Sequence, residues 1–120
     1  MEKTLFTLIF GLFMLLVCNE LSAQTIIKDS IAPDGTRIVQ YTPKGVCAVN
    51  IEIHTFGKYI KYVHYTRGCD GNQQGIATLV KDMKIKDAIN KLEGIKCGKK
   101  STSCPDQLAT ALKMMQEKEN

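Results

Sequence analysis

Residues 49–54 read VNIEIH, and this stretch decides the fold because apolar and polar side chains alternate along it. Alternation with a period of two places the two kinds of side chain on opposite faces of a β-strand. A short turn follows at residues 56–58, and residues 59–65 supply a returning strand. The apolar positions of the returning strand slip once from odd to even numbering, which predicts a β-bulge. The sequence therefore predicts an antiparallel hairpin with one buried face.

Upstream of the hairpin, the sequence predicts one more strand and a linker. Residues 36–41 are rich in β-forming residues and favour an edge strand, which ends at the turn residues 43–45. Residues 24–35 show little periodicity and contain the turn sequence Pro33-Asp34-Gly35. We therefore expect a linker over residues 24–35 and a folded domain over residues 36–120.

Downstream of the hairpin, the apolar period changes to that of helices. The first helix is expected to begin near Asn72, and the second to stop at Gly94 in the C′ position. Ser103 is expected to cap the third helix, with Pro105 in its first turn and Asp106 completing a capping box. The apolar positions of the three helices are Ile76, Leu79, Val80 and Met83, then Ala88, Ile89 and Leu92, then Leu108, Ala111, Leu112 and Met115.

Strands that precede helices along the chain predict an α+β fold. Its parts are a small antiparallel sheet, made of the hairpin and the edge strand, and about three helices packed on one face of that sheet. A chain of 120 residues has room for one modest core once a signal segment is removed. That size excludes a large catalytic barrel and a two-domain enzyme.

The first 23 residues have the pattern of a secretory signal peptide. Lys3 provides the positive start, residues 5–17 form an uncharged apolar run, and Ala23 stands before the expected cleavage point. The run is shorter than the roughly twenty apolar residues of a membrane-spanning helix. We expect an exported protein, periplasmic or secreted, whose mature chain carries no membrane segment and has lost Cys18.

The sequence lacks the features that bind single-stranded nucleic acid and the loop that binds nucleotides. The formal charge of +4 is spread along the chain, and the sequence contains no Trp. It therefore lacks the basic surface with stacking aromatic residues that binds single-stranded nucleic acid, and we expect no nucleic-acid partner. A glycine-rich phosphate loop with the spacing of a nucleotide fingerprint is also missing from the sequence.

Four cysteines stand at boundaries between the predicted elements: Cys47, Cys69, Cys97 and Cys104. Cys47 and Cys69 are expected at the same end of the sheet, because one begins a strand whose neighbour ends at the other. Cys104 begins a helix, and a helix N-terminus favours a thiolate. We predict that Cys47, Cys69 and Cys104 converge at this end, with Cys97 near enough to join them.

Three interpretations of the four cysteines remain open. Two disulfides are usual for an exported domain with an even number of cysteines. A tetrahedral thiolate site for zinc or an iron–sulfur cluster would use all four as ligands. Free thiols that cycle between redox states are the third interpretation.

Several motifs resemble the TSCPD domain family. Residues 102–106, Thr-Ser-Cys-Pro-Asp, spell the motif after which that domain is named. Further agreement lies at residues 45–47, 68–72 and 92–98, so the resemblance covers roughly residues 41–115. The family includes short stand-alone proteins, and the same module occurs toward the C-terminal end of adenosylcobalamin-dependent, class II ribonucleotide reductases.

The resemblance implies a relation to ribonucleoside-diphosphate reductase, a nucleotide-binding oxidoreductase of DNA precursor synthesis. About a hundred residues cannot build the barrel of such an enzyme, so we expect a module and not a complete reductase. The implied partner is a larger reductase subunit, through which alone the module would meet adenosylcobalamin. A fainter similarity to U-type iron–sulfur scaffolds implies that Cys47, Cys69 and Cys104 share one end of a small α+β domain. The identity of a metal and the oligomeric state stay open.

Overall fold

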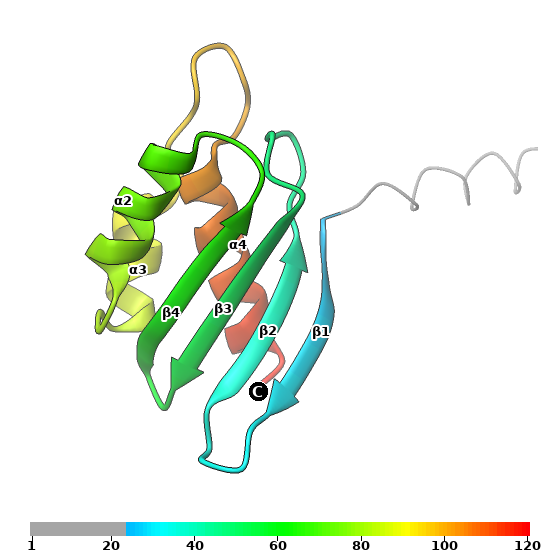
Figure 1. Cartoon of the computed structure of the whole chain (residues 1–120), viewed down its shortest axis with the longest axis vertical. Helices are drawn as coiled ribbons and strands as arrows, with labels where there is room; N and C mark the ends of the chain where they lie inside the picture. Colours follow the sequence, from blue (N-terminus) through cyan, green and yellow to red (C-terminus); the bar gives the residue numbers. More distant parts are fainter. Residues whose placement is uncertain (1–23) are drawn as a thin grey trace, which may run out of the picture.

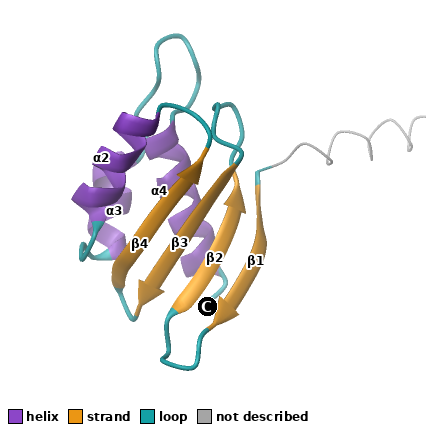
Figure 2. Ribbon diagram, viewed as in Figure 1, coloured by secondary structure: helices purple, strands orange, loops and turns teal. Residues whose placement is uncertain are grey.

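The computed structural model describes residues 24–120, which form a four-stranded sheet with helices on one face (Figure 1). The strands are β1 (Thr25–Ile31), β2 (Arg37–Thr42), β3 (Asn50–Phe56) and β4 (Tyr59–Thr66). The helices are α2 (Asp70–Val80), α3 (Ile85–Leu92) and α4 (Cys104–Glu117). All neighbouring strands are antiparallel, in the order β1-β2-β3-β4. The predicted α+β class is confirmed, and Figure 2 shows α4 behind the sheet with α2 and α3 on the side of β4.

The hairpin of β3 and β4 forms as its alternation predicts. Ile51 and Ile53 are fully buried and face the helices. His54 pairs with Tyr62 and Thr55 pairs with Ile60, so one extra residue of β4 lies between these pairs. The register shift at this point confirms the predicted bulge.

The segment expected as a linker instead begins with a strand. Residues 25–31 form β1, and residues 33–35 make the turn that joins it to β2. As a result, β2 is an inner strand between β1 and β3, whereas the sequence predicted an edge strand. The pattern hid β1 because almost all of its side chains are exposed, among them Ile27 and Ile31. An edge strand whose side chains are mostly solvated shows no alternation that marks a buried face.

The core lies between the sheet and the three helices. Leu108 and Leu112 of α4 are fully buried against the sheet, as the predicted stripe of the last helix requires. In α2, only Val80 among the predicted apolar positions is fully in the core, and Leu79 is 76% exposed. The helix α2 begins at Asp70, two residues before the expected start. Because Leu79 is exposed and Ile76 only partly buried, α2 presents apolar side chains to solvent.

The expected signal peptide lies in residues 1–23, outside the described part of the chain. Within residues 24–120, no helix combines the length and the apolar character needed to cross a membrane.

Candidate functional site

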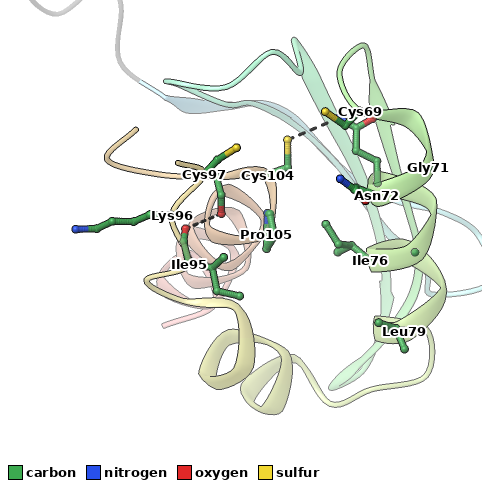
Figure 3. Close-up of a pocket in the computed structure, with 13 residues that line it drawn as sticks. Cys69, Gly71, Asn72, Ile76, Leu79, Ile95, Lys96, Cys97, Cys104 and Pro105 are labelled. Carbon is green, nitrogen blue, oxygen red and sulfur yellow. Dashed lines mark hydrogen bonds between the residues drawn. The ribbon is translucent and has the colours of Figure 1, made fainter. Parts of the chain in front are cut away.

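Three of the four predicted site cysteines line one pocket of about 470 Å³. Cys69 immediately precedes α2, Cys97 lies in the loop between α3 and α4, and Cys104 is the first residue of α4. Figure 3 shows their sulfur atoms at one rim of the pocket, with Ile76 and Leu79 further along α2. The structure thus brings together thiols from three segments that are distant in sequence.

Cys47 lies at the same end of the sheet but not among the residues that line this pocket. Its loop joins β2 to β3 and packs on the residues before α4: a Cβ added to Gly45 would lie 2.9 Å from the Thr102 methyl carbon. The Cys47 Sγ lies 3.9 Å from Lys100 Nζ. All four thiols of the described residues are free. The pocket therefore gathers three of the four cysteines that were expected to converge.

The Thr-Ser-Cys-Pro-Asp motif holds the loop before α4 in place. Ser103 Oγ accepts a hydrogen bond from the Asp106 N–H at 3.2 Å, which confirms the predicted helix cap. The same hydroxyl donates to the Ile95 carbonyl at 2.6 Å. The Asp106 carboxylate accepts from the Gly94 N–H at 2.7 Å and from the Thr102 hydroxyl at 2.5 Å. Asp106 thus ties the end of α3 to the start of α4 instead of closing the capping box onto the Ser103 backbone.

Gln107 is a structural residue of the site that the sequence reasoning missed. It is buried, and its Oε1 accepts hydrogen bonds from the Tyr41 hydroxyl and the Lys44 N–H, each at 3.0 Å. Its Nε2 donates to Thr102 Oγ1, also at 3.0 Å. Burial, and then the negative charge of Asp106, raise the pKa of Tyr41 to about 12. A polar residue directly after the motif was the available signal, and it connects β2 with the start of α4.

A second buried amide contacts the Cys104 sulfur. Gln73 is 5% exposed, and its Nε2 donates to the Arg67 carbonyl at 2.8 Å and to Cys104 Sγ at 3.7 Å. Gly68 makes room for this amide, because a Cβ there would lie 2.3 Å from Gln73 Nε2. Gly68 also has a φ of +109°, which disfavours any other residue. The Cys104 sulfur therefore lies beside a buried amide donor and belongs to the first residue of α4.

The surroundings of the thiols are apolar and basic. The hydroxyl of Tyr65 donates to the Cys104 carbonyl at 3.0 Å, and burial, followed by the charge of Cys104, raises the pKa of Tyr65. Lys96 lines the pocket, and Lys99 and Lys100 follow in the same loop. None of these three lysines takes part in the ion pairs found within residues 24–120. Of the three, only Lys96 is a lining residue, and Figure 3 shows its side chain extending away from the sulfur atoms.

The donor chemistry of the pocket suits a soft metal ion, since zinc and iron–sulfur clusters take cysteine thiolates as ligands. In the described part of the chain, however, no group of three or more His, Cys, Asp or Glu side chains is placed to hold a metal ion. The pocket cysteines would have to move closer to share one. The cysteines are suitable ligands, but their present positions do not form a coordination site.

Comparison with known families matches a model of the TSCPD domain to residues 25–116. The match begins at β1 and ends near the end of α4, so it includes the first strand and all four site cysteines. Comparisons with curated proteins and with solved structures gave no significant match.

Proposed function

Because this chain belongs to the TSCPD domain family, we propose that it is a thiol-based binding or redox module. Its working groups are Cys69, Cys97 and Cys104. One observation carries the proposal: three unbonded thiols from three segments line the same pocket. Cysteines that serve only to pack a core are buried, whereas Cys69 and Cys97 are exposed and all three open into the pocket.

In the metal-binding form of this proposal, the pocket cysteines are ligands of zinc or an iron–sulfur cluster. Cys47 is the fourth ligand, since it lies at the same end of the sheet, beside Lys100. Cys47, Cys69 and Cys97 are exposed, so three of the four side chains are free of the packing that would fix their positions. Binding then draws the loops together, as is common where metal binding and folding are coupled.

In the redox form, Cys97 and Cys104 exchange between two thiols and one disulfide. Their free state and their shared pocket support this form, and so does the absence of a ready metal group within residues 24–120. Cys104 is the nucleophile in this form, because it lines the pocket as the first residue of α4 and its sulfur accepts a hydrogen bond from the Gln73 amide.

The relation to ribonucleoside-diphosphate reductase enters the proposal as a partnership. A larger reductase subunit would supply the radical site, the nucleotide pocket and adenosylcobalamin, because one small core cannot hold them. The module would contribute thiols. Export of the mature chain, as the N-terminal sequence predicts, would instead give it a partner outside the cytosol.

Thiol and metal content of the purified protein, prepared without chelators and carrying Cys18→Ser so that only the four domain cysteines remain, test the proposal. We expect either stoichiometric metal or four titratable thiols, two of which oxidise reversibly. In the metal-binding form, Cys69→Ser, Cys97→Ser and Cys104→Ser should each abolish metal binding. Metal analysis and the thiolate-to-metal absorption of added Co²⁺ measure this loss. In the redox form, Cys97→Ser and Cys104→Ser should abolish the reversible disulfide.

The outcomes separate the alternatives. Loss of metal in each pocket variant supports the metal form, and a reversible disulfide in metal-free protein supports the redox form. Absence of both metal and titratable thiols, with two disulfides that resist mild reductants, would contradict the proposal and identify an exported domain stapled by disulfides.

A further inference from the structure

The thiol pocket continues into an apolar groove that the described residues leave uncovered. Leu79 is 76% exposed and Ile95 is 42% exposed, and both line the pocket together with Ile76 and Pro105. The volume of about 470 Å³ falls in the range of small-molecule sites, and a single ion needs far less space. The groove is therefore able to take an organic group attached to whatever meets the sulfurs.

Two glycines of α2 leave part of the groove wall without side chains. Gly71 and Gly75 line the pocket, and a Cβ added to either would meet no atom within 4 Å. Open space above two glycines of one helix lets a flat or bulky group approach the backbone closely. Leu79, one turn further on, then supplies an apolar surface for that group.

Charge gives the groove a second preference. Lys96 lines the pocket, and its ammonium group is free of the ion pairs formed within residues 24–120. Figure 3 shows the Lys96 side chain extending away from the pocket interior, so its charge acts outside the opening, where it attracts an approaching ligand that carries negative charge. Thiols, apolar wall and lysine therefore select three properties of one ligand.

We propose that the pocket takes a disulfide whose substituents are apolar and negatively charged. This inference rests on the redox form of the proposed function and names its substrate class. The apolar part of the disulfide lies on Leu79 and Ile95, and its sulfur–sulfur bond reaches the pocket thiols. Its negative group stays outside the opening, on the side of Lys96.

The reaction balances with the disulfide itself as the oxidant. The Cys104 thiolate attacks one sulfur of the substrate, so a mixed disulfide forms and the other half leaves as a thiolate that takes up a proton. The Cys97 thiolate then attacks Cys104 Sγ, forms the Cys97–Cys104 disulfide and releases the second half, which is also protonated. Two protein thiols are oxidised and the substrate is reduced to two thiols.

Exchange rates of the reduced, metal-free Cys18→Ser protein with three disulfides test this substrate class. The probes are the aromatic, anionic 5,5′-dithiobis(2-nitrobenzoate), the neutral 2-hydroxyethyl disulfide and the cationic cystamine. Each rate is divided by that of glutathione with the same probe, which removes the intrinsic reactivity of the probe. We expect the normalised rate to be about tenfold higher for the aromatic anion than for the other two.

Two variants assign the selectivity to the groove. Leu79→Gln should lower the normalised rate with the aromatic probe about fivefold and leave the hydroxyethyl probe unchanged, because only the first loses apolar contact. Ile31→Gln is the matched control, since Ile31 is 67% exposed on β1. Lys96→Gln should slow the anionic probe alone, with Lys28→Gln on β1 as its control. Circular dichroism should show unchanged folding in all four.

Equal selectivity in the protein and in glutathione, or equal effects of Leu79→Gln and Ile31→Gln, would overturn the substrate class while the thiol function stands. Thiols that form no Cys97–Cys104 disulfide with any probe would instead contradict the redox form itself. A cystine peptide with Phe and Asp beside one sulfur identifies the source of the substrate. A higher glutathione-normalised rate with that peptide than with the aromatic probe points to a protein disulfide as substrate. A lower normalised rate points to a small molecule.

Discussion

Replacing Asp106 by alanine should destabilise the domain by about 2–3 kcal/mol. The carboxylate accepts two hydrogen bonds, from the Gly94 N–H and from the Thr102 hydroxyl. Hydrogen bonds to a charged group contribute about 1.5–3 kcal/mol each. Here each bond contributes only about 1 kcal/mol, because Gly94 is exposed and its N–H can bond to water, and because Thr102 also accepts from Gln107. A carboxylate in the first turn of α4 adds about 0.5 kcal/mol through the helix dipole.

The measurement is urea unfolding of reduced protein followed by circular dichroism, with Asp70→Ala as the matched control. Asp70 is also a carboxylate in the first turn of a helix, but its one side-chain hydrogen bond, from Gln74, is exposed. We expect Asp70→Ala to cost no more than about 1 kcal/mol. The difference between the two variants isolates the tie between α3 and α4.

Equal destabilisation by the two variants, or a loss below about 1 kcal/mol for Asp106→Ala, would refute this reasoning. The motif aspartate would then act only through the helix dipole. A loss of about 2–3 kcal/mol with an unchanged denaturant slope supports a local tie, since an unchanged slope means that the surface exposed on unfolding is the same.

Two further predictions concern the buried Gln107 and the ion pair between Arg37 and Asp29. Gln107→Leu should cost about 2–3 kcal/mol in the same assay, because it leaves three polar groups without their partner, whereas the exposed Gln116→Leu should be nearly neutral. Arg37 lowers the pKa of Asp29 below 3.8, chiefly by hydrogen bonding. That stabilisation is present above about pH 3.8 and is lost as the pH falls through the lowered pKa. The stability gap between wild type and Arg37→Gln should therefore narrow between pH 6 and pH 2, and a constant gap would speak against it.

The sequence predicted those elements whose side chains meet the core. Residues 50–54 alternate because Ile51 and Ile53 lie on the buried face of β3, whereas Val49 precedes the strand and is 49% exposed. Gly94, with a φ of +83°, ends α3 as expected. The strand β1 escaped prediction because its stability comes from backbone pairing with β2, which leaves no hydrophobic pattern. The prediction for Leu79 was wrong for a different reason. Its helical spacing predicted a core residue, but Leu79 lines the pocket.

The candidate site divides along the same line. The antiparallel hairpin sufficed to place Cys47 and Cys69 at one end of the sheet, because one of them begins a strand whose neighbour ends at the other. Membership of the pocket depends on loop conformation, and loop conformation depends on long-range hydrogen bonds such as that from Gly94 to Asp106. Periodicity and spacing contain no record of such bonds. Within the Thr-Ser-Cys-Pro-Asp motif, the polar side chains bind one another and the neighbouring backbone, and Pro105 fits the first turn of α4. Only Cys104 keeps a reactive group at the pocket, so the motif as a whole is a support for one thiol.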